Sequence, residues 1–264
     1  MRVRFSKMHG LGNDFVVIDA LTQVHGLNPE KIAELADRQR GIGFDQLLLV
    51  ESASDGVSDF FYRIYNADGS AAEQCGNGAR CIAEFVARKG LSRTTQLRWQ
   101  TKAQPLHTER ISAGLIAVDM GEPSFAAAQI GLSKALPAFV YAVSMGNPHA
   151  VVPVKALAGY DVAAHAAQIV ASHAFANGVN VGFVERQSAD AIALRVVERG
   201  AGETLACGSG ACAAAAVLID QGLLSPRVVV ALRGGNLEIE WLGRGHAMTM
   251  RGPATFVFDA EIDI

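Results

Sequence analysis

Two stretches of this sequence place a cysteine where a glycine-rich loop gives way to a segment of helical composition. Cys75 opens the run CGNGA and Cys207 opens the run CGSGA, and an alanine-rich segment ending in Gly-Leu follows each of them. The interval between the two cysteines is 132 residues (207 − 75), and the two Gly-Leu pairs keep the same interval. We therefore predict that each cysteine is the last loop residue before a helix, in two related copies.

A helix start is a binding site for negative charge. Its first N–H groups have no intrahelical partner, and the aligned peptide dipoles leave about half a positive charge there. Glycine lets a ligand approach the backbone closely, and a thiol in this position has its pKa lowered from about 8.5. The sequence thus predicts two carboxylate sites, each with a reactive sulfur beside it.

Two such thiols suit the inversion of a carbon acid. One thiolate would remove an α-proton while the second thiol delivers a proton to the opposite face, which is racemisation or epimerisation. The two helix starts would stabilise the negative charge that develops on the carboxylate. The reaction needs neither a metal nor a ring cofactor, and the sequence carries no strong motif for either, so we expect no metal and no cofactor.

Amide side chains beside predicted strand ends are candidates for binding the ligand. Gln46 and Asn180 lie in matched apolar strands, where turn formation does not explain them, and buried amides need partners. A zwitterionic amino acid would supply those partners. The other amides lie at predicted strand ends or turns with glycine close by, where asparagine also serves in turns and caps: Asn13, Asn66, Asn77 and Asn147.

Charged and ionisable residues near the second cysteine admit two interpretations. Glu198 and Arg199 could form a surface ion pair of little energetic value, or could hold an ammonium and a carboxylate, since the arginine fork pairs bidentately with a carboxylate. His149 is either an ordinary loop histidine or a group that tunes a nearby thiol. Cys81 and Cys212 lie inside the alanine-rich segments and are expected to be small core residues.

The elements that must position these residues repeat along the chain. Gly12-Asn13 matches Gly146-Asn147 at the same offset that relates Gln46 to Asn180. This is a duplication rather than a solenoid, which needs three or more repeats, and two lobes facing each other would form one cleft. Hydrophobic patterning predicts helices after Asn28, over 161–174 and after each cysteine. It predicts strands at 3–5, 15–18, 47–50, 60–65, 97–101, 106–110, 115–120, 139–144, 150–154, 178–184, 192–197, 228–232, 237–241, 246–250 and 255–258.

Composition argues against several classes of protein. The chain has 264 residues, half of them hydrophobic, with a net charge of −3 and no basic block, which argues against nucleic acid as a partner. The N-terminal residues lack the apolar core of a secretory signal. The longest apolar run, 211–219, is far shorter than the roughly 18 residues of a membrane span. We expect a cytoplasmic protein with free cysteines and no membrane partner.

The motifs together resemble those of the diaminopimelate epimerases, nearly end to end. The matching runs are KMHGLGNDF at 7–15, YNADGS at 65–70, EQCGNG at 73–78, GNPH at 146–149 and ERGAGETLACGSG at 198–210. The resemblance implies a cofactor-independent interconversion of L,L- and meso-2,6-diaminopimelate in lysine and peptidoglycan precursor biosynthesis. It also implies a homodimer, although Phe258 stands where some members carry a tyrosine that helps dimerisation.

The resemblance further implies an α+β fold of two pseudo-symmetric domains. Each would be a mostly antiparallel, barrel-like sheet around a central helix, with the active site in the cleft between the domains. The N-terminal lobe would comprise 1–118 plus 252–264, and the C-terminal lobe 119–251.

Carried over by position, Cys75 and Cys207 would be the acid–base pair, and His149 with Glu198 would tune their pKa values. The reacting carboxylate would be held by the backbone at Gly76, Asn77, Gly208 and Ser209, with Asn13 and Gln46 nearby. The distal amino-carboxylate end would be held by Asn66, Asn147, Asn180, Glu198 and Arg199.

Other functions are less consistent with these residues. A proline racemase-like enzyme, the nearest alternative, would have a histidine after the first Cys-Gly and an Asp-rich approach to the second cysteine, where this chain has Asn77 and Glu198-Arg199. The phenazine-type isomerases lack the two thiols. An amino-acid binding protein has no need of two matched cysteines, and a thiol oxidoreductase would place its cysteines close together in sequence.

Overall fold

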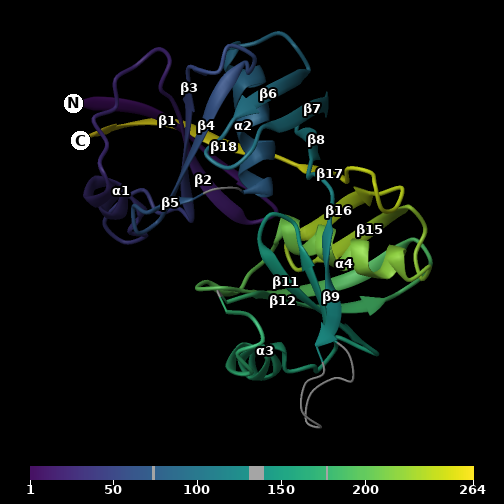
Figure 1. The fold of residues 1–264 in the computed structure, drawn as a ribbon. Coiled ribbons are helices and arrows are strands. Elements are labelled where there is room, and N and C mark those ends of the chain that lie inside the picture. The colour runs from purple at the N-terminus through teal and green to yellow at the C-terminus, as the bar shows by residue number, and fades with distance from the viewer. Residues whose placement is uncertain (73–74, 131–139, 177) are drawn as a thin grey trace. The chain divides into compact units, whose positions relative to one another are not determined.

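The structure is a computed structural model that describes residues 1–72, 75–130, 140–176 and 178–264. The chain divides into two compact units, Met1–Val118 with Gly252–Ile264 and the continuous segment Asp119–Arg251. The described part of each unit holds a mixed, mostly antiparallel sheet and two helices (Figure 1). No helix in these described ranges is long and apolar enough to cross a membrane.

In the first unit the strands follow the order β18–β1–β2–β3–β4, and β4 continues into β6–β7–β8. The pairs β2–β3 and β4–β6 are parallel and the others are antiparallel. The elements are β1 (Arg2–Gly10), β2 (Asn13–Asp19), α1 (Pro29–Ala36), β3 (Gln46–Glu51), β4 (Phe60–Asn66), β5 (Ala71–Ala72), α2 (Gly76–Lys89), β6 (Gln96–Gln100), β7 (Leu106–Ser112), β8 (Leu115–Asp119) and β18 (Thr255–Asp263).

The second unit repeats this topology. The pairs β11–β12 and β13–β15 are parallel, as β2–β3 and β4–β6 are, and β9 pairs with β10 as β18 pairs with β1. The predicted duplication is confirmed, and the pairings among the described strands leave the sheets open. The elements are β9 (Ser124–Ile130), β10 (Val140–Ser144), β11 (Pro148–Val154), α3 (Val162–Ala171), β12 (Asn180–Arg186), β13 (Ala191–Glu198), β14 (Gly202–Glu203), α4 (Gly208–Asp220), β15 (Arg227–Leu232), β16 (Gly235–Glu240) and β17 (Thr249–Pro253).

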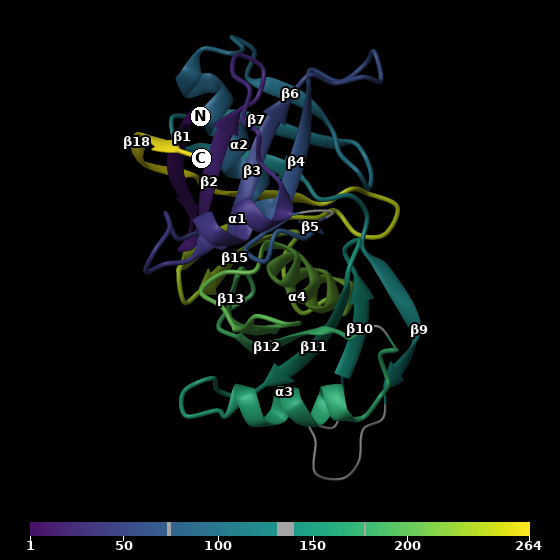
Figure 2. The same ribbon diagram turned by 90° about the vertical axis from the view of Figure 1, so that its left-hand side faces the viewer.

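Helices cover both faces of the inner strands in each unit, which explains the unbroken apolar runs of β2 and β3, whereas the outer strands β6, β7 and β15 alternate buried and exposed residues. Successive side chains of a strand point to opposite faces. Val16, Leu47 and Leu49 therefore pack with α1, whereas Leu48 faces the start of α2 beside Gly78. In the second unit β11 and β12 lie between α3 and α4 (Figure 2).

The helices that follow the two cysteines are the most buried helices of the described chain. Nearly all residues of α4 from Gly208 to Leu218 are buried, and α2 is buried from Asn77 to Val86. Alanine and glycine let α4 approach the strands closely on several sides, whereas α2 also buries larger side chains such as Arg80, Glu84 and Phe85. Helix α2 ends at Gly90 in the left-handed conformation that favours glycine. The prediction of a helix directly after each cysteine is confirmed.

Several boundaries differ from the sequence prediction for local reasons. Strand β9 was not expected, because Gly121-Glu122-Pro123 indicates a break, but the chain extends again directly after it and pairs with β10. The strand expected at 178–184 begins at Asn180, since Gly178 has a φ of +73° that excludes it from a strand. The strand expected at 246–250 lies at Thr249–Pro253. Residues 243–246 form a turn instead, in which the N–H of His246 donates to the carbonyl oxygen of Gly243.

Two further expectations changed at their ends. The helix expected over 161–174 ends at Ala171, with Ser172 as its C-cap and His173 at a φ of +55°. Of the strand expected at 139–144, residue 139 lies outside the described residues, and the strand begins at Val140.

The turn after β4 gives a test of backbone strain at an element that carries a candidate residue. Gly69 donates its N–H to the oxygen of Asn66 and has a φ of +80°, and a Cβ there would lie 2.1 Å from the oxygen of Pro29. Gly90 has a similar φ of +68° with nothing within 4 Å of its Cβ position. Gly90→Ala should therefore cost about 1 kcal/mol of unfolding free energy, from strain alone.

We predict that Gly69→Ala costs several kcal/mol more than Gly90→Ala, because a clash with backbone adds to the strain. Urea unfolding of the two variants and the parent measures both losses. Equal losses would show that the turn moves away from Pro29 without cost.

Candidate active site

Cys75 is the N-cap of α2, as its sequence predicts. Its backbone is extended, and its Sγ accepts the N–H of Gly78 at 3.3 Å. The side chain is half-buried, and all four cysteines are free thiols. A helix N–H that points at the sulfur is a donor to negative charge there, so the local geometry suits a thiol that gives up its proton.

Tyr62 forms a hydrogen bond to Cys75, the residue before this helix. Its hydroxyl donates to the carbonyl oxygen of Cys75 at 3.4 Å, and a Cβ at Gly78 would lie 2.3 Å from the same hydroxyl. Burial, followed by the nearby Cys75 and Cys81, raises the pKa of Tyr62 well above its ordinary value. The phenol therefore stays neutral, and glycine is required at position 78.

Asn13 reaches the same thiol from the β1–β2 hairpin. Its Oδ1 lies 3.8 Å from the Sγ of Cys75 and accepts from the Nδ2 of Asn77 at 3.2 Å. The hairpin turn is made by Leu11 and Gly12, both with positive φ, as two-residue turns of the primed type require. Leucine is costly in that conformation, but the Leu11 side chain is buried, which offsets the cost.

Gln46 and Asn66 form a second amide pair in this unit. They face each other across β3 and β4, and the Nε2 of Gln46 donates to the Oδ1 of Asn66 at 3.0 Å. The Oε1 of Gln46 is buried and accepts no hydrogen bond from the described residues. A buried acceptor of this kind calls for a donor, and an ammonium or hydroxyl of a ligand would serve.

Cys207 is the N-cap of α4 but has a different environment. It is buried, its side chain accepts no cap hydrogen bond, and its Sγ lies 3.7 Å from the hydroxyl of Ser209. Burial, followed by the Glu198 carboxylate, raises the pKa of Cys207 well above its ordinary value, against weaker opposition from the Gly210 N–H and Ser209. The expectation of a lowered thiol pKa at both helix starts is therefore wrong for Cys207, because dehydration and a neighbouring anion outweigh the helix.

Glu198 is the last residue of β13, Arg199 follows it, and the two side chains have different contacts. Glu198 Oε1 accepts from the hydroxyl of Thr204 at 2.6 Å, and the carboxyl group also contacts the Cys207 thiol. The backbone N–H of Arg199 donates to Asn180 Oδ1 at 2.9 Å. The Arg199 stem passes over Gly178, where a Cβ would lie 2.7 Å away. Glu198 thus acts on the thiol, while Arg199 is exposed.

His149 and Asn147 belong to the same group of residues around Cys207. Asn147 Nδ2 donates to the hydroxyl of Ser209 at 3.4 Å, and its Oδ1 accepts from His149 Nε2 at 3.0 Å. Burial lowers the pKa of His149 to about 4, so the imidazole is neutral, and its buried Nδ1 has no partner among the described residues. Hydrogen bonds therefore connect His149 to the helix start that follows Cys207.

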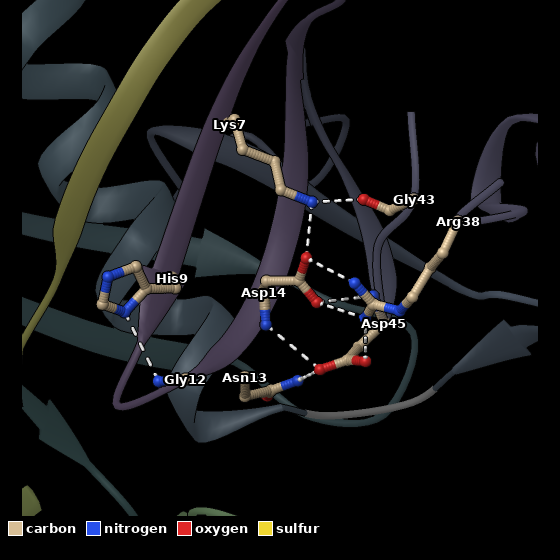
Figure 3. A network of polar contacts seen from close by, with 8 residues as sticks. All are labelled: Lys7, His9, Gly12, Asn13, Asp14, Arg38, Gly43 and Asp45. Atoms are coloured by element: carbon tan, nitrogen blue, oxygen red, sulfur yellow. Dashed lines mark hydrogen bonds and ion pairs between the residues drawn. The ribbon is translucent and has the colours of Figure 1, made fainter. Parts of the chain in front are cut away.

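Sequence reasoning missed a network of charges beside Asn13 (Figure 3). Asp14 contacts both Lys7 and Arg38, and Arg38 also donates to Asp45. Asp45 in turn accepts from Asn13 Nδ2 at 2.8 Å. Asp14 and Asp45 each adjoin a predicted site residue in sequence, and this adjacency was the only signal available.

The predicted site residues thus form two half-sites, one in each unit. The first joins Cys75 with Asn13 and Asn77, with the Gln46–Asn66 pair in the same unit. The second joins Cys207 with Ser209, Asn147 and His149, and includes Glu198, Arg199 and Asn180. Gly76 and Gly208 are the first residues of the two helices.

The remaining cysteines have no place in either half-site. Cys81 and Cys212 are fully buried inside α2 and α4, as expected of small core residues, and burial raises the pKa of Cys81 above its ordinary range. Within the described ranges no group of three or more His, Cys, Asp or Glu side chains is arranged to hold a metal ion.

Comparison with known proteins gives a family and a fold. The family model for diaminopimelate epimerase matches residues 5–126 and 141–257. A diaminopimelate epimerase of Chromobacterium violaceum is 48% identical over 276 residues, covering 100% of each chain.

Two solved structures of other enzymes share the fold. A phenazine biosynthesis protein of the PhzF family from Bacillus anthracis has a TM-score of 0.77 at 17% identity, covering 100% of both chains. A hydroxyproline epimerase from Agrobacterium vitis has a TM-score of 0.72 at 15% identity, covering 99% of this chain and 92% of that one. At these identities the likeness concerns the fold alone.

The buried neutral His149 should make stability depend on pH. The pKa of His149 in the folded protein, about 4, lies below its ordinary value of 6.5. As the pH falls from about 6.5 to 4, the imidazole is therefore protonated in the unfolded chain but not in the folded one. Stability from this group is complete above pH 6.5, and about 3 kcal/mol is lost by pH 4.

Urea unfolding at pH 7 and near pH 4 measures the effect, with His149→Gln expected to lose less stability on acidification than the parent. The exposed His246→Gln is the matched control and should behave as the parent does. An identical pH dependence in His149→Gln and the parent would contradict the prediction.

Proposed function

Because the chain belongs to the diaminopimelate epimerase family, we propose that it interconverts L,L- and meso-2,6-diaminopimelate without a cofactor. Membership makes it an isomerase of lysine biosynthesis. The observation that carries the proposal is the duplicated helix start, with Cys75 and Cys207 as the N-caps of α2 and α4. One helix start alone would bind a carboxylate, whereas two thiols provide a base and an acid.

In the proposed reaction the two thiols act on opposite faces of one α-carbon. A thiolate takes the α-proton, the electrons of the C–H bond move into the carboxylate as an enediolate, and the second thiol gives its proton to the other face. The second sulfur ends as the thiolate, so no electrons are gained or lost. Each proton transfer contributes roughly 10²–10⁴-fold to the rate.

The unequal environments of the thiols support a division of roles in one direction. Burial and Glu198 favour the protonated form of Cys207, which suits the proton donor. Cys75 receives the Gly78 N–H, which suits a sulfur that carries negative charge after losing its proton. In the reverse direction the roles exchange, so the environments need to differ only modestly once substrate is bound.

The substrate contacts follow from the two helix starts and the amides around them. We propose that the reacting carboxylate binds the backbone at Gly76, Asn77, Gly208 and Ser209, with Asn13 and Gln46 beside it. The unpartnered Gln46 Oε1 supports this, since an ammonium group would satisfy it. The distal amino-carboxylate end would bind Asn66, Asn147, Asn180, Glu198 and Arg199.

A proline racemase-like activity is the alternative that the fold leaves open. The hydroxyproline epimerase shares the architecture at 15% identity, and this carries no information on the substrate. Asn77 and the Glu198-Arg199 pair favour the longer substrate with a second amino-carboxylate end.

We also propose that the enzyme is a cytoplasmic homodimer. On β18, Val257 and Phe258 are each about half exposed. The ring of Phe258 also contacts the ring of Phe5 on the neighbouring strand β1. Apolar side chains on a sheet face are suited to a second copy. A monomeric mass by sedimentation at micromolar concentration would contradict the dimer.

The first prediction concerns the two thiols. In D₂O the reduced protein should convert L,L-diaminopimelate to the meso isomer with deuterium at the inverted carbon. Cys75→Ala and Cys207→Ala should each lower this rate by roughly 10²-fold or more, because each removes one proton transfer.

Cys81→Ala and Cys212→Ala are the matched controls, since they make the same change inside the same helices and should keep the activity. Conversion that survives in Cys75→Ala or Cys207→Ala would exclude the two-thiol reaction. A parent that binds the ligand but does not convert it would point to a binding protein.

The second prediction concerns the distal end of the substrate. Arg199→Lys replaces a planar fork by a point charge, and the bidentate contact to a carboxylate is then lost. We expect KM to rise roughly tenfold, with little change in the free energy of unfolding because Arg199 is exposed. Steady-state kinetics and urea unfolding measure the two effects, and an unchanged KM would remove Arg199 from the site.

A further inference from the structure

Asn13 is the amide that decides what the Cys75 sulfur faces. Its Oδ1 lies 3.8 Å from Cys75 Sγ, and its Nδ2 donates to Asp45 Oδ2 at 2.8 Å. An amide oxygen only accepts and an amide nitrogen only donates. If the amide turned over, an N–H₂ group would face the thiol in place of an acceptor, and the sulfur would lose a partner for its proton.

The amide belongs to a chain of hydrogen bonds with a charge at each end. Arg80, which is fully buried, donates to Asn77 Oδ1 at 2.9 Å, and Asn77 Nδ2 donates to Asn13 Oδ1 at 3.2 Å. A guanidinium has only donors and a carboxylate accepts. Arg80 and Asp45 therefore favour the same arrangement, in which the Oδ1 of Asn77 and of Asn13 points towards Arg80 and the Nδ2 of each points towards Asp45.

The anionic end of this chain is itself held in place (Figure 3). Asp45 Oδ1 accepts from Arg38 at 2.7 Å, and Asp45 Oδ2 accepts from the Asp14 backbone N–H at 3.1 Å. The Asp45 backbone N–H returns a bond to the carbonyl oxygen of Asp14 at 3.0 Å. The start of β2 and the residue before β3 are thus joined by two backbone contacts, which fixes Asp45 relative to Asn13.

Asp14 anchors that junction from the less exposed side. Lys7 and Arg38 bond to its two carboxylate oxygens, and Lys7 also donates to the oxygen of Gly43. Burial alone would raise the pKa of Asp14, but hydrogen bonds from Arg38 and Lys7 outweigh burial and lower that pKa. A carboxylate held by two cations keeps the junction in one arrangement.

We propose that Asp45 is a positioning residue for the reaction: it fixes the Asn13 amide so that Oδ1, and not Nδ2, faces the Cys75 thiol. The inference rests on the proposed function for its kinetic consequence and on geometry for its effect in the free protein. With Asp45 in place, the thiol proton has an acceptor and the amide needs no reorientation when the substrate arrives. Without the anion, Asn77 alone holds the Asn13 amide. An Asn13 that turns over can then donate to the sulfur, which favours the thiolate in the absence of substrate.

The variant Asp45→Asn tests this because it removes the charge and keeps the shape. An asparagine there cannot offer oxygens to both Arg38 and Asn13, so only the hydrogen bond from Asn77 still orients Asn13. Asp37→Asn is the matched control, since Asp37 pairs with Arg40 in an exposed ion pair that does not belong to the chain of bonds. Asn13→Ala and the double variant Asn13→Ala with Asp45→Asn complete the set.

The first readout needs no substrate. The full-length, reduced, ligand-free protein is treated with iodoacetamide at neutral pH, and mass spectrometry follows modification of the Cys75 peptide. Asp45→Asn should raise this rate by up to roughly tenfold, the effect of one hydrogen bond to a charged sulfur. Asp37→Asn should leave it unchanged, and in the Asn13→Ala background Asp45→Asn should add nothing. A general loosening of the site would instead raise the rate in that background too, which would overturn the proposal.

The second readout is epimerisation by the same proteins. Asp45→Asn should lower kcat/KM in the parent and leave it unchanged in the Asn13→Ala background, because the effect passes through the amide. A loss of equal size in both backgrounds, or no loss in the parent, would overturn the positioning role in the reaction. If the parent does not epimerise diaminopimelate, the proposed function fails while the alkylation readout still decides whether Asp45 orients Asn13.

Discussion

The constraint on which this structure depends is that a buried helix must begin at each of two cysteines, Cys75 and Cys207. The first N–H groups of a helix have no partner within it, so a helix packed on nearly every side can open only towards a cap or an anion. Both α2 and α4 are packed in this way. The parallel pairs β4–β6 and β13–β15 on either side of these helices, and the glycine at position 78 beside Tyr62, accommodate them.

Duplication gives two equivalent helix starts, and the residues around them make the two thiols unequal. Cys75 has a backbone donor and an amide oxygen beside it, whereas Cys207 is buried next to a carboxyl group and a serine. A proton transfer between two sulfurs across one carbon requires one proton for two bases, and a fully symmetric pair would have no preference for either state. The asymmetry arises both from strand residues, Asn13 and Glu198, and from the first turns of the helices, where Ser209 lies beside Cys207.

Much of this could be predicted from the sequence, and what could not has a physical reason. The spacing of Cys75 and Cys207 revealed the duplication and both helix starts, and a glutamine at the start of an apolar strand indicated a polar partner for Gln46. The raised pKa of Cys207 depends on burial, which is a property of tertiary packing. The contact between Asn13 and Asp45 joins the first residue of β2 to the residue before β3 and has no periodic signature. Strand β9 was hidden by the Gly-Glu-Pro break before it.

The return of β18 to β1 has a consequence for how the protein is made. The two strands pair from Arg2 with Asp263 to His9 with Thr255, so both chain ends belong to the first unit (Figure 1). The second unit is one continuous segment. Ribosomes add roughly 5–20 residues per second, so β1 waits on the order of ten seconds for its partner, with one edge unpaired. The nascent chain therefore completes its second unit first, and the strand that is made first is among the last to gain both of its neighbours.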